Sequence, residues 1–145
     1  MLSHKTRVSV IIPTYNEKDT IGELISHIEK YRETFDLSLI IIDDESMDGT
    51  REIVSKYCGI YPNLHIIVRR NQRGLGSAIL DGFRFALNET PKPEYILTMD
   101  ADLSHDPSEI PSMVKTCSFG SIVIGSRYTE WGEHRRLEHQ KKVNI

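Results

Sequence analysis

Residues 37–44 read LSLIIIDD, an apolar run that stops at two adjacent aspartates. Its consecutive apolar positions predict a strand that is buried on both faces, which is typical of a parallel strand covered by helices on either side. The same kind of segment recurs along the chain. We predict further strands over residues 7–12, 64–68, 95–99 and 121–124.

Helices are predicted between these strands. They begin near Thr20, where Glu23 completes a capping-box pattern, near Asp48, at Gly76 and at Asp106, where Pro111 predicts an irregular first turn. Five strands that alternate with four helices indicate βαβ units with right-handed crossovers. The expected fold is therefore α/β, a doubly wound and mostly parallel sheet with helices on both faces.

Composition narrows the function. The 145 residues include 39% hydrophobic and 27% charged residues, and the formal net charge is −3, so no overall positive field favours nucleic acid. Cys58 and Cys117 lack the spacing of a zinc site. The apolar runs are far shorter than the ~20 residues of a membrane helix. We expect a globular protein that acts in water.

Polar residues follow every predicted strand, at 13–17, 43–44, 69–70, 100–102 and 125–127. In open α/β sheets, ligands bind beyond the carboxyl ends of the strands. Carboxylates gathered there repel one another unless a divalent cation or a guanidinium lies between them. Asp100 and Asp102 suit Mg²⁺ or Mn²⁺, which takes one or two carboxylates together with phosphate oxygens. The implied substrate is a phosphorylated nucleotide, and Arg127 suits a diphosphate or an acceptor phosphate.

Two other readings are weaker. Gly74-Leu75-Gly76 lacks the third glycine of a dinucleotide-binding loop, because position 79 is Ile. A signalling receiver domain would also carry an acidic pair and a phosphoacceptor aspartate. That fold places the pair after its first strand and a lysine after its fifth, whereas here a βα unit precedes Asp43 and the fifth strand ends in Arg127.

Five segments together resemble a known family: VSVIIPTYNE (8–17), IIIDDESMDGT (40–50), NQRGLGSAILDGF (71–83), MDADLSHDP (99–107) and IGSRY (124–128). In this order they are similar to family 2 glycosyltransferases of GT-A fold, and most similar to the dolichol-phosphate or polyprenol-phosphate mannosyltransferases. The resemblance covers residues 8–128.

The resemblance implies a nucleotide sugar bound across the strand ends, with residues of four segments around it. Pro13, Tyr15 and Glu17 would surround the nucleoside, with Ile42 and Asp44 at the base. Asp100, Ala101 and Asp102 would contact the ribose, the diphosphate and the metal, with Ser104 as a weaker ligand where some relatives have Gln. Asp102 and Arg127 would be the catalytic residues. Glu45 stands where many members have Gly and narrows the base pocket.

The implied reaction moves a hexose, mannose from GDP-mannose, to a polyprenyl or dolichyl phosphate with inversion and with help from Mg²⁺ or Mn²⁺. An alternative is a family 2 transferase that uses a UDP-sugar and a sugar hydroxyl in polysaccharide synthesis. Such an enzyme would act at the cytoplasmic face of a membrane through peripheral contact. The sequence does not indicate an oligomeric state.

The C-terminal part departs from the family. Family members continue past the position of Ile145 with helices that carry basic residues, so the resemblance implies that the C-terminal part of the domain is missing. We expect residues 1–128 to form the nucleotide-sugar-binding core. Residues 129–145 are expected to be an acceptor-side tail that is poorly ordered.

Overall fold

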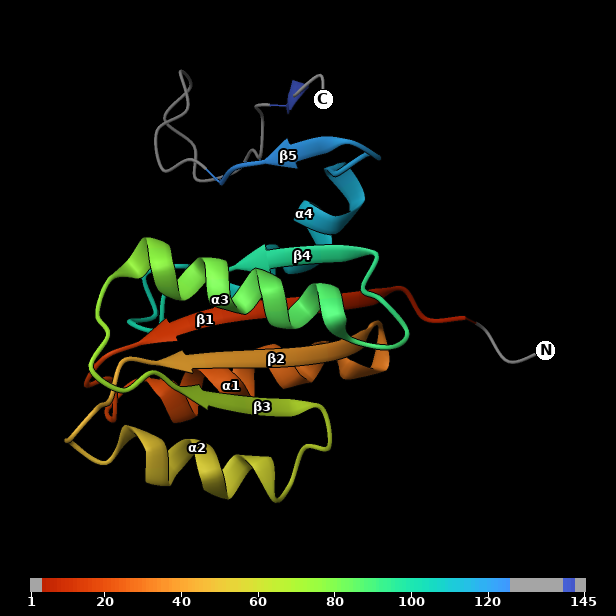
Figure 1. Ribbon diagram of the computed structural model, residues 1–145. Helices are drawn as coiled ribbons and strands as arrows, with labels where there is room; N and C mark the ends of the chain where they lie inside the picture. The colour runs from red at the N-terminus through yellow and green to blue at the C-terminus, as the bar shows by residue number, and fades with distance from the viewer. Residues whose placement is uncertain (1–3, 126–139, 143–145) are drawn as a thin grey trace. The chain divides into compact units, whose positions relative to one another are not determined.

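The computed structural model of the protein describes residues 4–125 and 140–142. The chain divides into two compact units, Met1–Asp106 and Pro107–Ile145. The first unit contains the four strands β1 (Arg7–Thr14), β2 (Asp36–Asp43), β3 (Leu64–Val68) and β4 (Tyr95–Thr98). They form one parallel sheet in the order β3-β2-β1-β4, as Figure 1 shows. The parallel sheet is thus confirmed for the first four predicted strands.

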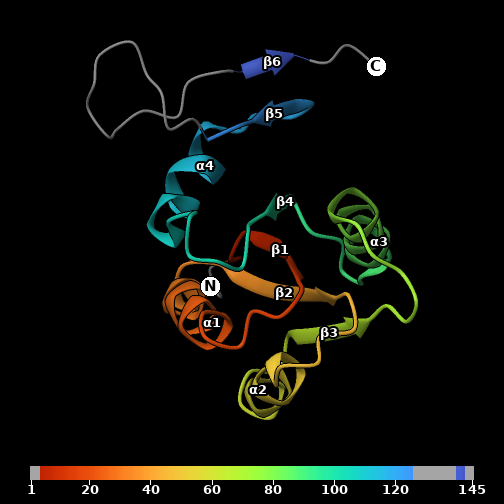
Figure 2. The same ribbon diagram turned by 90° about the vertical axis from the view of Figure 1, so that its left-hand side faces the viewer.

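Helices cover both faces of this sheet (Figure 2). One face carries α1 (Ile21–Glu29), which continues into the short 3-10 helix η1 (Lys30–Glu33), and α2 (Thr50–Cys58). The other face carries α3 (Leu75–Asn88), which crosses from β3 to β4. Right-handed crossovers require this arrangement, because the chain moves in one direction from β1 to β3 and then returns to the far side of β1.

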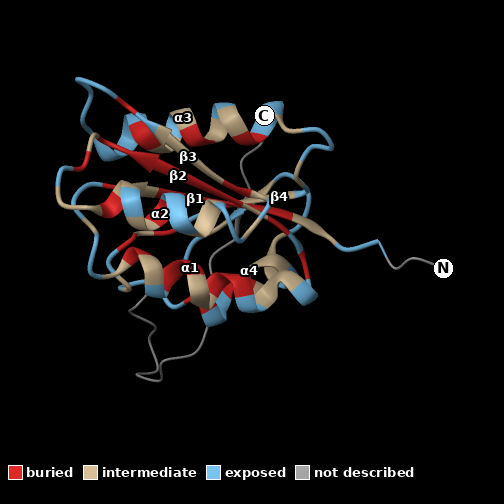
Figure 3. Cartoon of the chain, turned by 90° about the horizontal axis from the view of Figure 1, so that it is seen from below, coloured by how far each residue is buried: buried red, intermediate tan, exposed pale blue. Residues whose placement is uncertain are grey.

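β-branched side chains fill both faces of the sheet. Beneath α3, Ile11, Ile40 and Ile42 form a fully buried cluster with Ala78 and Ala86. The buried residues of Figure 3 lie along the strands and on the inward surfaces of the helices. Consecutive isoleucines therefore pack toward the helices on both faces of the sheet, as the run of apolar residues at 37–42 predicts.

Helix α3 approaches the sheet closely through Gly82. A Cβ atom at this position would lie 2.4 Å from Cγ2 of Ile11, well inside ordinary contact distance. The C-terminal end of α3 is attached by Glu89, whose carboxylate accepts hydrogen bonds from the Ser9 hydroxyl (2.7 Å) and the Ser38 hydroxyl. The packing of Gly82 on Ile11 and the hydrogen bonds of Glu89 therefore hold α3 close against β1 and β2.

The second unit differs from the prediction. It contains η2 (Pro107–Glu109), α4 (Ile110–Thr116), β5 (Ser121–Val123) and β6 (Gln140–Lys142). The irregular turn before α4 is confirmed, since η2 is a 3-10 helix. The prediction that residues 121–124 extend the parallel sheet is wrong for the described residues, because β5 pairs antiparallel with β6. Periodicity predicts a strand but does not select its partner.

One predicted cap is also wrong. Thr20 precedes α1 but makes no side-chain hydrogen bond to the first turn of the helix. Its hydroxyl donates instead to the Glu17 carboxylate at 3.1 Å. The expected acceptor-side tail, residues 129–145, lies outside the described residues apart from the backbone of β6.

Candidate functional site

The strand order reverses between β1 and β4, and this is the position at which open α/β sheets bind ligands. The backbone N–H of Met99 donates to the carbonyl of Ile11 (3.0 Å), which brings the segment after β4 beside the end of β1. All four arrowheads in Figure 1 point to one edge of the sheet. The loops that follow β1 to β4 therefore share this carboxyl edge, as predicted.

The loops after β1 and β2 are tied to each other. The backbone N–H of Asn16 donates to the Ser46 hydroxyl at 2.8 Å, and Asn16 Oδ1 accepts from the N–H of Met47 at 3.1 Å. The N–H of Glu17 donates to the Thr50 hydroxyl at 2.8 Å. These bonds place Asn16 in the left-handed region, with φ of 57°. The nucleoside side of the predicted site thus has a fixed backbone.

Asp43 has a structural role. Its side chain is fully buried and accepts hydrogen bonds from the Thr14 hydroxyl (2.9 Å), the Ser46 hydroxyl (2.6 Å) and the Ser46 backbone N–H (2.9 Å). A buried carboxylate with three donors is satisfied where it stands. Asp43 therefore joins β1 to the loop after β2 and presents no surface to a ligand.

Asp44 faces the opposite way and meets Arg69. Arg69 donates to Asp44 through Nε at 2.7 Å and through Nη2 at 3.1 Å, and the backbone N–H of Gly74 adds a third bond at 2.9 Å. The Arg69 side chain is 3% exposed and the Asp44 side chain 10% exposed. Hydrogen bonding to Asp44 is the largest cause that raises the pKa of Arg69. This bidentate pair fixes the Asp44 carboxylate at the sheet edge.

Arg69 also connects the sheet edge to α3. Its Nη1 donates to the Ser77 hydroxyl at 2.9 Å and to the Asp81 carboxylate at 3.2 Å. No local sequence pattern distinguishes Arg69 from the other residues of the polar loop after β3. The only signal was a guanidinium next to an edge crowded with carboxylates, where an opposing positive charge was expected.

A hollow of about 430 Å³ opens beside this pair. On one side of it the Arg73 guanidinium lies over the ring of Tyr15, 4.3 Å from the centroid. Glu45 enters with a left-handed backbone, at φ of 57°, and its Oε2 accepts from the Asn71 N–H at 3.2 Å. The hollow is lined by Asp44, Glu45, Asn71, Gln72 and Arg73.

The second pair of carboxylates follows β4. Asp100 has a side chain that is 48% exposed, with Oδ2 at 3.6 Å from Nε2 of His105, whose Nδ1 accepts from the Asp100 backbone N–H at 3.1 Å. Asp102 is exposed and accepts from the Ser104 N–H at 2.9 Å. Hydrogen bonds from the Ser104 side chain and backbone are the main causes that lower the pKa of Asp102.

These residues fit a divalent cation that a phosphate ligand completes. Residues 4–125 contain no group of three or more His, Cys, Asp or Glu side chains able to hold a metal by themselves. Two exposed carboxylates are nevertheless what Mg²⁺ or Mn²⁺ uses when phosphate oxygens and waters supply the other ligands. Asp102, with its lowered pKa, is ionised under ordinary conditions. The donor set therefore suits a metal that arrives with a diphosphate.

The other predicted residues are distributed as follows. Pro13 and Glu17 are partly buried at the end of β1 and in the loop after it, and Tyr15 is 43% exposed. Ile42 is fully buried in the cluster beneath α3, and Ala101 is buried between the two acidic residues. Arg127 lies outside the described residues. The structure thus brings the predicted residues of β1, β2 and β4 to one edge, except that Ile42 belongs to the core.

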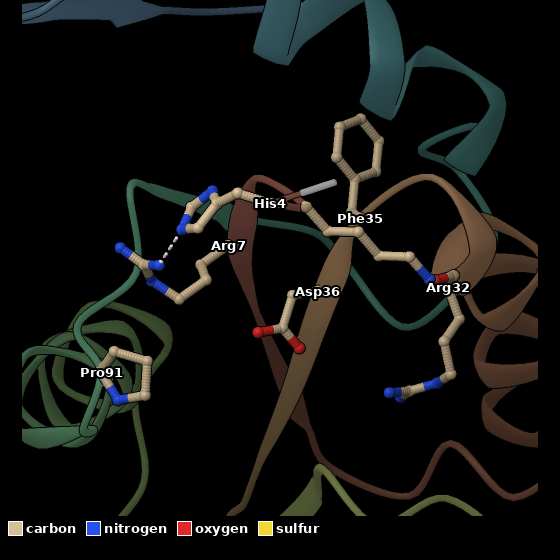
Figure 4. Close-up of a pocket in the computed structure, with 7 residues that line it drawn as sticks. His4, Arg7, Arg32, Phe35, Asp36 and Pro91 are labelled. Carbon is tan, nitrogen blue, oxygen red and sulfur yellow. Dashed lines mark hydrogen bonds between the residues drawn. The ribbon is translucent and has the colours of Figure 1, made fainter. Parts of the chain in front are cut away.

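A second hollow lies at the opposite, amino edge of the sheet (Figure 4). It measures about 300 Å³, and its basic groups already have partners. Lys5 Nζ donates to the Arg32 carbonyl at 2.9 Å, and Arg7 Nε donates to the Lys92 carbonyl at 2.7 Å. The guanidinium of Arg7 also pairs with the Glu94 carboxylate, and that of Arg32 pairs with the Glu29 carboxylate. We therefore place the candidate site at the carboxyl edge.

None of the helices in the described part of the chain is long and apolar enough to cross a membrane.

The protein has an α/β fold that matches the structures of GT-A glycosyltransferases. Over residues 9–144 the sequence matches the family described as Glycosyl transferase family 2, and the chain belongs to that family. The resemblance drawn from the five sequence segments is thereby confirmed.

Several curated relatives are named dolichol-phosphate mannosyltransferase. The protein of that name from Pyrococcus furiosus is 38% identical over 138 residues, which cover 94% of this chain and 38% of the relative. The one from Saccharomyces cerevisiae is 36% identical over 142 residues, covering 89% of this chain and 50% of the relative. The chain thus spans half or less of the length of these relatives.

Solved structures agree on the fold. A mannosyltransferase from Pyrobaculum calidifontis in complex with GDP-Man and Mn²⁺ is 30% identical, with a TM-score of 0.56 over 69% of this chain and 28% of that one. A glucosyl-3-phosphoglycerate synthase from Mycobacterium tuberculosis in complex with UDP is 22% identical, with a TM-score of 0.59 over 81% of this chain and 42% of that one. The second likeness supports the fold alone.

Proposed function

We propose that this chain is the donor-binding part of a mannosyltransferase that moves mannose from GDP-mannose to the phosphate of a polyprenyl or dolichyl lipid with inversion. Two observations carry the proposal: a hollow of about 430 Å³ lined by residues that follow β2 and β3, and the carboxylates of Asp100 and Asp102, which follow β4 at the same carboxyl edge of the parallel sheet. The names of the relatives from Pyrococcus furiosus and Saccharomyces cerevisiae, and the GDP-Man complex of the Pyrobaculum calidifontis enzyme, support the choice of sugar and acceptor.

In this proposal the edge divides the donor between its two acidic groups. Asp44 and the hollow beside it take the base, Tyr15 and Glu17 lie at the nucleoside, and Asp100 and Asp102 hold Mg²⁺ or Mn²⁺ against the diphosphate. When bound, such a metal stabilises the negative charge that develops on the leaving diphosphate. Ser104 keeps the Asp102 carboxylate oriented and ionised. Arg127 is proposed to bind phosphate.

The acceptor chemistry explains why no general base is assigned. A lipid phosphate is already anionic near neutral pH, so its oxygen attacks the anomeric carbon without prior loss of a proton. Positioning of the two reactants then contributes most to the rate. The lipid acceptor implies peripheral contact with a membrane, and a nucleotide-sugar donor implies its cytoplasmic face.

Ligand-linked stability tests the donor and metal roles together. A ligand that binds only the folded chain stabilises it and so raises its melting temperature. The stabilisation is about 2.7 kcal/mol when the ligand concentration is about 100 times the dissociation constant. We expect GDP-mannose with Mn²⁺ to raise it more than GDP-mannose alone. Asp102→Asn should lose the part of the rise that depends on the metal. Asp36→Asn, an exposed aspartate at the amino edge, is the matched control and should behave as the wild type.

The same titration separates the alternatives. An equal rise with and without Mn²⁺ would exclude the metal role of Asp100 and Asp102. A larger rise with UDP-glucose than with GDP-mannose would favour a transferase of the polysaccharide-synthesising kind. No response to any nucleotide sugar would contradict the proposed function.

A further inference from the structure

Glu45 is an unusual residue for its position. Its φ of 57° lies in the left-handed region, which a side chain with a Cβ atom occupies at an energetic penalty and glycine occupies freely. The residue nevertheless lines the hollow beside Asp44, with one carboxylate oxygen 3.2 Å from the Asn71 N–H. A strained backbone that carries an acidic side chain into a pocket indicates that the side chain has a use there.

Asp44 by itself offers little to a base. A carboxylate has about four acceptor positions. Three hydrogen bonds already reach Asp44, two from Arg69 and one from Gly74. Two of these end on Oδ2 and one on Oδ1. Asp44 can therefore accept about one further N–H, on Oδ1.

Glu45 supplies the acceptor capacity that Asp44 lacks. Among the hydrogen bonds of residues 4–125, its carboxylate receives the one from Asn71, on Oε2. Glu45 follows Asp44 directly in the sequence and lines the same hollow. Both carboxylates therefore offer acceptor positions to a ligand in this hollow.

The bases of nucleotide sugars differ in this respect. Guanine presents two neighbouring donors on one edge, the ring N1–H and the exocyclic amino group, and acceptors at O6 and N7. Uracil presents one N–H between two carbonyl oxygens, and these would face carboxylate oxygens here. Arg73, whose guanidinium lies over the Tyr15 ring, also lines the hollow, and its N–H groups can donate to acceptors such as O6.

We propose that Glu45 is a specificity-determining residue which, together with Asp44, makes this hollow prefer a guanine over a uracil nucleotide. The proposal rests on the proposed function, in that the same edge is taken to bind a nucleoside diphosphate. It adds a residue-level cause for the choice of base, and that cause is the acceptor capacity of one side chain.

The test compares the dissociation constants of GDP and UDP, measured by isothermal titration calorimetry with Mn²⁺ present. The proteins are the 145-residue chain, Glu45→Gly, Glu45→Gln and, as a matched control, Glu52→Gln on the exposed side of α2. Glycine is compatible with the left-handed backbone, so Glu45→Gly is expected to fold. We expect GDP to bind about tenfold more weakly to Glu45→Gly, with UDP binding unchanged or stronger. Glu45→Gln should lie between, and Glu52→Gln should match the wild type.

Each result decides the proposal. A GDP preference in the wild type that shrinks by about tenfold in Glu45→Gly supports it. A ratio of GDP to UDP affinity that is the same in the wild type and Glu45→Gly overturns it, while the proposed function stands. A wild-type preference for UDP also overturns it. Binding of neither nucleotide overturns the proposed function, and the proposal with it.

Discussion

Gly82 sets the distance between α3 and the sheet, and Gly82→Ala should therefore destabilise the fold. The added methyl carbon would lie 2.4, 3.1 and 3.2 Å from Cγ2, Cγ1 and Cδ1 of Ile11. Carbon atoms attract best at about 3.5–4.0 Å, so the closest contact is too short by more than about 1 Å. Either α3 shifts away from β1 or Ile11 leaves its rotamer, and overpacking of this kind costs about 1–3 kcal/mol.

A second glycine of the same helix provides the control. Gly76 lies in the first turn of α3, and a Cβ atom there has no heavy atom within 4 Å. Alanine favours the helix over glycine by up to about 1 kcal/mol at either position. Gly76→Ala should therefore be neutral or stabilising, and Gly82→Ala should be less stable than Gly76→Ala by about 1–3 kcal/mol.

Urea unfolding followed by circular dichroism measures both variants. Adding Ile11→Ala removes all three atoms that the new methyl group meets, so Gly82→Ala should cost less in that background than in the wild type. If Gly82→Ala is as stable as Gly76→Ala, or if its effect is the same with and without Ile11→Ala, the close approach of α3 to β1 is refuted.

Three further predictions concern polar contacts. Arg69→Leu leaves the buried Asp44 carboxylate with the Gly74 N–H alone and should cost about 3–5 kcal/mol in urea unfolding, whereas the double variant Arg69→Leu/Asp44→Leu should recover part of the loss. Bonds from Arg84 and Arg69 lower the pKa of Asp81 in the folded state, so its stabilising effect is present above the unfolded pKa of about 3.9 and is lost as the pH falls through the folded value. The stability difference between wild type and Asp81→Asn should accordingly be larger at pH 7 than at pH 3, and a constant difference would contradict this. Glu89→Ala removes the acceptor of the Ser9 and Ser38 hydroxyls and should cost about 1–3 kcal/mol, whereas an unchanged midpoint of thermal unfolding would show that these bonds add no net stability.

Much of the first unit could be predicted from the sequence, because its elements carry strong local patterns. The apolar run at residues 37–42 identifies a strand buried on both faces, and the alternation with helices then fixes a parallel sheet. The polar residues after each strand follow from the same topology, since parallel strands end at one edge. The places of Asp44, Asp100 and Asp102 at that edge were thus within reach of the sequence.

What the sequence did not reveal depends on contacts between distant residues. Arg69 and Asp44 are 25 positions apart, and no local pattern pairs them. Asp43 is fully buried whereas the Asp44 side chain is 10% exposed and meets Arg69, a difference that depends on the pleat, which turns successive side chains to opposite faces. The partner of β5 was missed for the same reason, because a three-residue strand carries too little pattern to select a neighbour.

In the proposed function Asp44 both binds the base and supports the fold, which has a consequence for how this fold can change. The same carboxylate holds β2, the loop before α3 and a buried arginine together, so a substitution that altered recognition there would also weaken the scaffold. In the described part of the chain, the Glu45 side chain accepts from the Asn71 N–H and the Arg73 side chain lies over the Tyr15 ring, and neither joins as many parts of the fold as Asp44 does. Selection for a different nucleotide, in nature or in the laboratory, should therefore act through these two neighbours and leave the aspartate in place.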